Sequence, residues 1–188
     1  MNKSRIYFKN NPWPEGHPVQ AFKWSAKLID GHVWFDLHLE SEDYYSERAV
    51  VEADDIEYPS DWDAPIVWGN YHACTLSSTF WDNQGFRVCR LAEYTPAYFN
   101  DRRFEVDSHP EDIEDWDALA FHIYLLGHDA VAEHQIHFEQ VAGTENFNIH
   151  WTGKIALAYS GQSKFEHEFS AYIENVIFPQ LIFDENSD

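Results

Sequence analysis

The segment 147–159, FNIHWTGKIALAY, has an apolar residue or glycine at every odd position. A period of two places the odd residues on one face of a β-strand and the even residues on the other. A helix would scatter the odd residues around its axis. The segment therefore predicts a long strand with one buried face. Because it is longer than most strands, we expect a bend or bulge at Thr152-Gly153.

A β-hairpin is predicted nearer the N-terminus. Alternate residues are apolar from Phe22 through Trp24 to Leu28, and again from Val33 to Leu39. The dipeptide Asp30-Gly31 between the two runs is a favoured two-residue hairpin turn. The apolar residues of both runs are expected to face the core.

A meander of four strands is predicted in the C-terminal half. Alternation over 119–125, 134–138 and 165–177 adds three strands to the one at 147–159. The last run places Phe165, Phe169, Ala171, Ile173 and Ile177 on one face. The segment 111–126 also gathers apolar residues at helical spacing, so a helix is the alternative there. We favour the strand.

The segments between these elements are less regular. Residues 66–80 and 86–91 predict two strands joined by a turn at 82–85. In that register Cys74 and Cys89 lie about 13 Å apart along the strands. A disulfide needs Cα atoms within about 7 Å, so two reduced thiols are expected.

Three further segments have weaker local signals. Residues 95–110 contain two prolines and are expected to be irregular. The sequence from Ser108 to Glu111 fits a capping box, which predicts a short helix around 110–118. A short strand is expected at 48–52, inside an acidic connection that spans 41–64.

Together these patterns predict a mainly β fold. We expect an antiparallel β-sandwich or a strongly curved sheet of roughly eight strands, built from hairpins and a C-terminal meander, with one or two short helices at most. The length of 188 residues fits a single β-rich domain over residues 1–188. The aromatic content of 17% agrees, because aromatic residues favour strands.

The net charge restricts the possible partners. Twelve Lys and Arg residues against 33 Asp and Glu residues give −21 and an isoelectric point near 4.6. Such a field repels nucleic acids and anionic membranes and attracts basic proteins. The first residues contain no apolar run typical of a secretory signal, and no segment approaches a membrane span. A cytoplasmic location is therefore expected.

Signatures of catalysis and metal binding are weak. His134 and His137 are three residues apart, so on a strand they point to opposite faces and cannot share a metal ion. The pair His72 and Cys74 supplies two ligands, fewer than a zinc site needs. There is no nucleophile motif and no phosphate-binding loop. We predict no metal, no cofactor and no catalytic residue, and we lean against an enzyme.

The most distinctive surface feature is acidic and aromatic residues mixed in two connections. Tyr and Trp anchor protein interfaces, and carboxylates steer and pair with basic partners. The predicted binding residues are Tyr44, Tyr45, Asp54, Asp55, Glu57, Tyr58, Asp61, Trp62 and Asp63 in the first connection, and Asp112, Glu114, Asp115, Trp116 and Asp117 in the second.

The leading functional hypothesis is a non-enzymatic acidic protein that binds a basic protein partner, as inhibitors and immunity proteins do. It predicts no direct contact with nucleic acid or membrane. The alternative is a carbohydrate- or small-ligand-binding β-sandwich, either as a binding protein alone or as a hydrolase that uses paired carboxylates. That alternative predicts a cleft lined by Trp or Tyr with two facing acids. The burial of Trp62 and Trp116 bears on the choice, since buried rings cannot anchor a partner.

Overall fold

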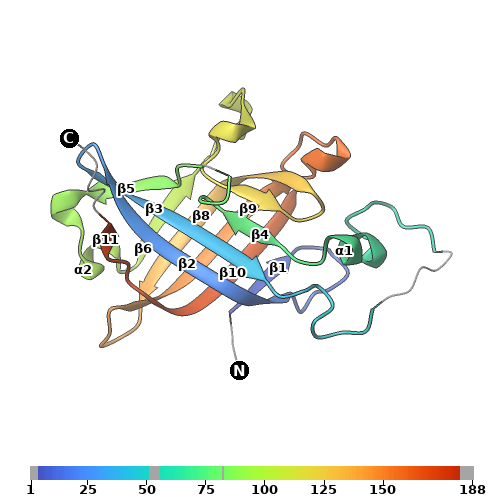
Figure 1. Cartoon of the computed structure of the whole chain (residues 1–188), viewed down its shortest axis with the longest axis horizontal. Helices are drawn as coiled ribbons and strands as arrows, with labels where there is room; N and C mark the ends of the chain where they lie inside the picture. Colours follow the sequence, from blue (N-terminus) through green and yellow to red (C-terminus); the bar gives the residue numbers. More distant parts are fainter. Residues whose placement is uncertain (1–3, 51–55, 82, 183–188) are drawn as a thin grey trace.

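The structure is a computed structural model and describes residues 4–50, 56–81 and 83–182, a part with eleven strands and two short α-helices. A mainly β fold with two short helices is thus confirmed. The strands are β1 (Arg5–Phe8), β2 (His17–Ile29), β3 (His32–Ser41), β4 (Thr75–Ser77), β5 (Phe86–Arg90), β6 (Arg102–Val106), β7 (His122–Tyr124), β8 (His128–Gln140), β9 (Asn146–Ala156), β10 (His167–Ile177) and β11 (Leu181–Ile182), and the helices are α1 (Pro65–Tyr71) and α2 (Pro96–Phe99) (Figure 1).

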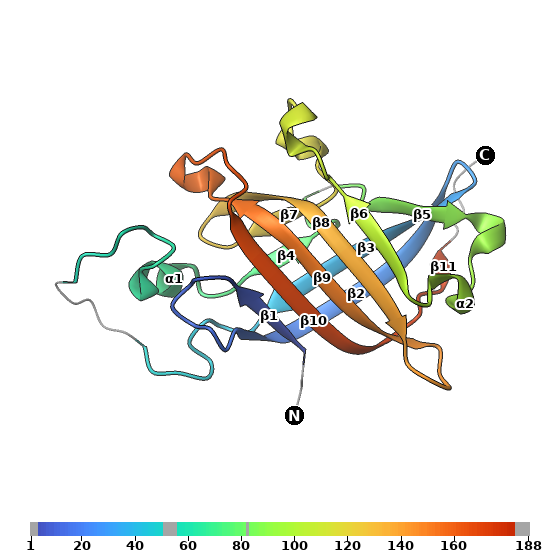
Figure 2. The ribbon, with the colours of Figure 1, turned by 180° about the vertical axis from the view of Figure 1, so that it is seen from behind.

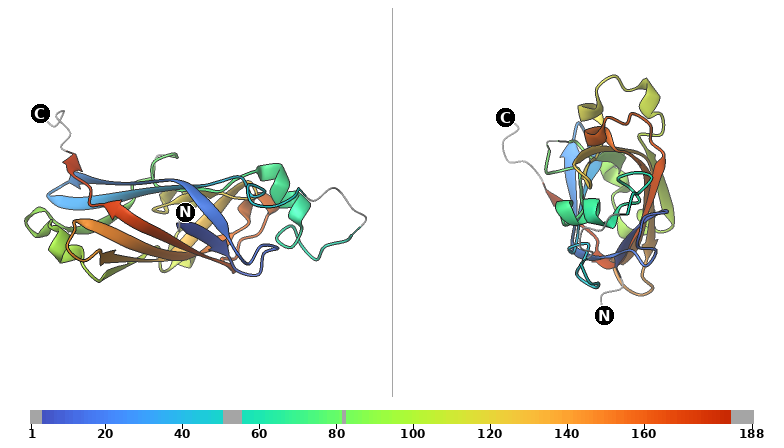
Figure 3. Two further views of the ribbon diagram at one scale, coloured as in Figure 1. Left: turned by 90° about the horizontal axis from the view of Figure 1, so that it is seen from below. Right: turned by 90° about the vertical axis from the view of Figure 1, so that its right-hand side faces the viewer.

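Eight of these strands close into a barrel. Their order is β2-β1-β10-β9-β8-β7-β4-β3, and β3 pairs back onto β2. In Figure 1 the blue strands β2 and β3 cross the front, and Figure 2 shows β8, β9 and β10 on the opposite wall. Figure 3 shows the elongated barrel from below and from one end. Strands β5, β6 and β11 extend the wall beside β3, β8 and β2.

The predicted sandwich is wrong, because the β2–β3 pairing joins what would be two sheets into one closed wall. The alternative, a strongly curved sheet of roughly eight strands, lies closer to the structure. The pairing register shifts within β2, β8 and β10, and Glu133 and Asn175 have positive φ at two of these shifts. Bulges bend and twist strands, which lets long strands coil until the edges meet.

The N-terminal hairpin is confirmed. Ile29 pairs with His32, and Asp30 and Gly31 form the turn with φ of 48° and 73°. A type I′ turn needs positive φ at both central residues, which glycine adopts at little cost. The turn fixes the register, so Val33 and the alternate residues that follow it in β3 are fully buried.

Strand β9 confirms the strand predicted at 147–159, with its odd residues buried from Phe147 to Leu157. Tyr159 is an exception: the strand ends at Ala156 and the Tyr159 side chain is 66% exposed. The expected bulge lies in the neighbouring β8, opposite Gly153. A Cβ at Gly153 would come within 2.8 Å of His134 Nδ1, so glycine there makes room for the bulged histidine.

The C-terminal meander is confirmed as the consecutive neighbours β7, β8, β9 and β10. The segment 111–126 is not a helix. Two 3-10 turns, Pro110–Asp112 and Trp116–Ala118, replace the short helix expected at 110–118, and β7 follows. Ile177, expected on the inner face, is 74% exposed, because the register shift after Ile173 reverses the alternation.

The strand predicted over 66–80 is wrong in its first half, where α1 forms instead. Pro65 suits the first turn of a helix, and Trp68 packs its ring under the connection before it. Strands β4 and β5 pair with different halves of β3 rather than with each other. Cys74 and Cys89 are buried free thiols beside those two halves.

Residues 95–110 are more regular than expected. The Thr95 hydroxyl accepts a hydrogen bond from the Tyr98 N–H and caps α2, and β6 then pairs with β8. In the strand expected at 48–52, residues 48–50 are not extended in a sheet, and 51 and 52 lie outside the described residues.

Aromatic rings fill the barrel interior. Trp24 stacks on Phe138 at 4.9 Å between ring centroids and meets the edge of Phe35 at 5.0 Å. Trp151 lies 4.8 Å from Phe121 on the neighbouring side. Eight-stranded barrels have interiors that side chains can fill, which agrees with a packed core.

A histidine lies inside this apolar packing. His134 is buried, and its Nδ1 accepts a hydrogen bond from Trp151 Nε1 at 3.1 Å. Burial lowers the pKa of His134 to about 3, against a smaller opposing effect of a hydrogen bond with the Val131 backbone. Burial likewise lowers the pKa of His17 to about 3, with Arg48 adding to the shift. Both imidazoles are therefore neutral in the folded protein near pH 7.

We expect Trp151→Ala to lower the free energy of unfolding by about 3–5 kcal/mol, because it leaves a cavity and removes the partner of His134. Urea denaturation of the variant and the wild type measures this loss. Ile177→Ala, at an exposed position, should change stability by less than about 0.5 kcal/mol. An unchanged melting temperature in the Trp151 variant would contradict the core described above.

We expect stability to fall on acidification below about pH 6.5, the pKa of histidine in an unfolded chain. Below that pH the histidines of the unfolded chain are protonated, whereas buried His134 and His17 stay neutral in the folded protein. Each of the two therefore lowers the free energy of unfolding by up to about 1.4 kcal/mol for every pH unit of acidification. His134→Asn keeps an acceptor for Trp151 and removes one titrating group. Urea titrations between about pH 6 and 4 should show that its slope is smaller by that amount.

Candidate functional site

The first acidic connection is partly built into the fold. Trp62 is buried, its Nε1 donates to the Lys9 carbonyl at 3.1 Å, and its ring stacks on His167 at 4.1 Å. These contacts hold Trp62 in place, and all of them are made with other parts of the same chain. Trp62 therefore cannot anchor a partner.

The two tyrosines of this connection are also structural. The Tyr44 hydroxyl donates to the Leu125 carbonyl at 3.2 Å, and burial raises the pKa of Tyr44 well above its usual value. The Tyr45 hydroxyl donates to the Pro65 carbonyl at 2.9 Å at the start of α1. Tyr44 thus ties the connection to the chain after β7, and Tyr45 ties it to α1.

The second acidic connection is more open. Trp116 is half-buried, and its ring packs on Phe165 at 5.2 Å. The Asp115 carboxylate accepts a hydrogen bond from the Asp117 N–H at 3.0 Å, which forms the 3-10 turn around Trp116. The acids of this connection point to solvent.

The structure brings the two connections together against the segment that joins β9 to β10. Ser160 Oγ donates to Asp61 at 3.2 Å, His167 stacks on Trp62, and Phe165 packs on Trp116. Figure 1 shows this orange segment between the olive 110–118 segment and the teal segment leading into α1. Of the predicted acids, those exposed there are Glu57, Asp61, Asp112, Glu114, Asp115 and Asp117; Tyr58 and Asp63 are half-buried, and Asp54 and Asp55 lie outside the described residues.

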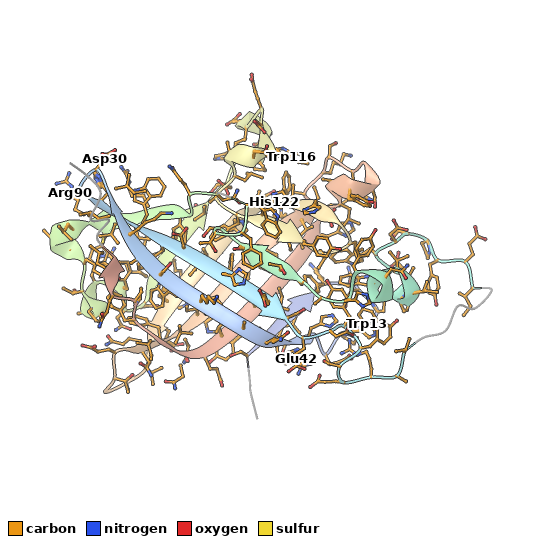
Figure 4. The ribbon with its side chains drawn as sticks, in the orientation of Figure 1. Trp13, Asp30, Glu42, Arg90, Trp116 and His122 are labelled. Carbon is orange, nitrogen blue, oxygen red and sulfur yellow. The ribbon has the colours of Figure 1, made fainter. Side chains whose placement is uncertain are left out.

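A continuous row of aromatic side chains crosses the outer face of β3, β4 and β7 beside these acids. We call it the aromatic strip; it comprises His38, Phe80, Trp81, His122, His128, Tyr124, Tyr71 and Tyr159. Tyr159 at one end is 66% exposed, and Phe80, which covers the buried His38 at the other end, is 57% exposed. In Figure 4, labelled His122 and Trp116 lie on the same upper side of the barrel.

The alternation of the strands creates the strip. Ile123 of β7 is fully buried, so His122 and Tyr124 on either side of it face outward. Tyr124 pairs with His128 across the ladder, which places their rings 5.4 Å apart. Trp81, from the loop after β4, then lies 4.9 Å from the His122 ring.

Carboxylates border the strip. Burial, and then the neighbouring His128, lowers the pKa of His122. The nearby Asp117 carboxylate opposes that shift. At the other end, burial and then Tyr159 and Tyr124 raise the pKa of Tyr71, and Asp61 adds to that shift. The second acidic connection therefore borders the strip at His122, in its middle, and the first borders it at Tyr71, next to its Tyr159 end.

A groove of about 700 Å³ lies on another part of the wall, over β1, β9 and β10. Its acids are Glu133, 2.6 Å from Lys154 Nζ, and Glu168, 2.9 Å from Lys9 Nζ. Each carboxylate thus has a cation beside it, and Tyr7 and Phe8 are the aromatic residues that line the groove. The groove therefore has a Tyr, as the hydrolase alternative predicts, but its two acids are ion-paired rather than free.

Known proteins offer no guide to this surface: no family model matches the chain, and no curated protein or solved structure is significantly similar to it.

The histidines are distributed as the strand interpretation predicts. His134 points into the barrel and His137 outward, where its Nε2 lies 2.7 Å from Asp101 Oδ1. His72 is exposed, whereas Cys74 is fully buried and burial raises its thiol pKa far above the usual value. Within the described residues, no three His, Cys, Asp or Glu side chains are grouped to hold a metal ion. No helix in that part is long and apolar enough to cross a membrane.

The strip was missed by the sequence interpretation, although one signal was present. In 119–125 the inward residues are Leu119, Phe121, Ile123 and Leu125, so the alternation itself leaves His122 and Tyr124 outside. Two aromatic residues on the solvent face of a strand are a cue for binding. Phe80, Trp81 and Tyr159 come from loops, and their position follows only from the closed barrel.

We expect Trp62→Ala to cost about 3–5 kcal/mol of unfolding free energy, because it empties a buried site and frees the Lys9 carbonyl. Trp116→Ala removes a half-buried ring on Phe165 and should cost about 1 kcal/mol. Urea denaturation of both variants tests this difference. Equal losses would contradict the division into a structural and a surface tryptophan.

Proposed function

We propose that this protein is a non-enzymatic acidic binding protein that engages a basic protein partner, in the manner of an inhibitor or immunity protein. The observation that carries the proposal is the aromatic strip, which exposes Phe80 and Tyr159 and is bordered by Asp61 and Asp117. Exposed contiguous aromatic surface marks an interaction site when it is rimmed by polar groups.

The charge determines which partners fit. With a net charge of −21, the chain repels phosphate backbones and anionic lipids within the Debye length, which shortens as salt is added. A basic protein is attracted by the same field, and the acids that border the strip can pair with its Lys and Arg residues. The rings then supply contact area that is desolvated on binding, where most binding energy is concentrated.

The proposal replaces part of the surface expected from sequence. The acids of the two connections remain its charged rim, whereas Trp62 and Tyr44 act as supports beneath it. The anchors become rings of the strip such as Trp81 and Tyr159. The partner would therefore contact the outer face of β4 and β7 and the acids beside it.

An affinity capture from the lysate of the native source tests the proposal. We expect the immobilised protein to retain a protein of high isoelectric point at about 50 mM salt and to release it at about 500 mM salt, because screening weakens charge attraction. Asp61→Asn with Asp117→Asn should reduce retention. Glu105→Gln with Glu145→Gln, at exposed positions away from the strip, changes the net charge equally and should retain the partner.

The outcome that contradicts the proposal is also defined. If the wild type retains no basic protein at low salt, or if both charge variants lose retention equally, the strip and its bordering acids Asp61 and Asp117 do not recognise a basic partner. Retention of acidic or neutral proteins alone would have the same meaning.

A carbohydrate-binding role is the second candidate, and the same strip supports it, since sugars stack on exposed aromatic rings. Binding of a neutral oligosaccharide, measured by calorimetry, would be insensitive to salt. That insensitivity distinguishes it from the binding of a basic protein.

A further inference from the structure

The aromatic strip leaves ring faces that the fold does not use. Phe80 covers His38 at 4.3 Å on one side, yet more than half of its surface is exposed. Tyr159 lies 6.4 Å from Tyr71, and two thirds of its surface is exposed. Both rings come from loops, but His122 and Tyr124 between them lie on β7, which pairs with β4 on one side and β8 on the other, so this part of the surface is formed before any partner arrives.

A ring face next to a carboxylate is suited to a guanidinium group. Arg is planar, stacks on aromatic faces and pairs with carboxylates through two parallel hydrogen bonds, whereas Lys offers a strongly hydrated point charge. The chain contains this geometry elsewhere: the Arg102 guanidinium lies 4.2 Å from the Tyr98 ring centroid, and that of Arg48 lies 5.0 Å from Trp13. Arg48 also pairs with Glu15 at 2.7 Å.

The strip repeats these elements without an arginine of its own. The Trp81 and His122 rings lie 4.9 Å apart near Asp117, and the Tyr71 and Tyr159 rings lie near Asp61. A partner segment would therefore find rings and a carboxylate at two places on the strip, with Tyr124 between them.

We propose that the aromatic strip docks an arginine-rich segment of the basic partner, with guanidinium groups stacked on its rings and paired with Asp117 beside His122 and with Asp61 beside Tyr71 and Tyr159. The proposal rests on the proposed function and narrows it, because it specifies the face and selects Arg over Lys. Lysine-rich partners of the same charge would be attracted but would stack poorly.

Fluorescence anisotropy with labelled nine-residue peptides tests this inference at about 50 mM salt. One peptide carries four Arg residues, a second carries Lys at the same positions, and a third carries uncharged citrulline, which keeps the planar group. We expect the Arg peptide to bind about tenfold more tightly than the Lys peptide, because only the guanidinium group stacks flat on a ring and pairs with a carboxylate through two hydrogen bonds. The citrulline peptide should not bind measurably.

Matched variants locate the site. Phe80→Ala with Tyr159→Ala removes exposed rings from both ends of the strip and should bring the Arg peptide down to the affinity of the Lys peptide. Leu91→Ala with Ile177→Ala removes exposed apolar side chains outside the strip and should leave the tenfold preference intact. Urea denaturation confirms that both double variants remain folded.

The outcomes separate this inference from the proposed function. Equal affinity for Arg and Lys peptides, with loss in Asp61→Asn/Asp117→Asn, overturns the arginine preference while a basic partner still stands. If neither charged peptide binds the wild type, both proposals fail. If maltohexaose or chitohexaose binds the strip and neither charged peptide does, the surface is assigned to a neutral sugar and the inference is overturned.

Discussion

The pairing of β2 with β3 is the interaction on which the rest of the structure depends. The Asp30-Gly31 turn fixes which residues of these strands oppose each other, and the hairpin then joins β1 on one side to β4 on the other. Without that pairing the remaining strands would form an open sheet with two free edges, which aggregate readily. Closure also decides which side of every strand is interior, and so it determines the outer face that carries the aromatic strip.

Alternation in the sequence predicts much of this wall. The hairpin and the order β7, β8, β9, β10 follow from a period of two, because each connects strands that are neighbours both in sequence and in space. Closure could not be predicted in this way. It requires β1 to pair with β10 and β4 with β7, and those contacts join distant short segments with little alternation of their own.

Bulges limit what alternation can predict, even within a correctly assigned strand. Ile177 has the parity of an inward residue, but the register shift after Ile173 turns it outward. Gly153 predicts the position of a bulge correctly, but the extra residue lies in the neighbouring strand β8. There, His134 occupies the space that a side chain at position 153 would fill. A glycine in one strand can therefore report a distortion in its neighbour.

The candidate site could be predicted only in part, because the contacts between its loops depend on the closed barrel. Acidic residues in loops are usually exposed, so Asp61 and Asp117 could be expected at the surface from their sequence context. Their convergence on the β9–β10 connection could not, since it depends on where the barrel brings three loops together. Burial of a tryptophan is also decided by tertiary packing: Trp62 and Trp116 have nearly the same acidic neighbours in sequence, and only Trp62 is enclosed.

The same carboxylates limit self-association of the protein through its exposed aromatic surface. Rings such as Phe80 and Tyr159 would favour association between copies of the chain, because burying them removes apolar area from water. Two copies that met through their strips would also bring Asp61 and Asp117 of both chains together, within a net charge of −21 on each. Desolvating like charges opposes that contact, whereas a basic partner meets both the rings and the acids favourably. The acidic rim thus selects against self-association through the charge that attracts the proposed partner.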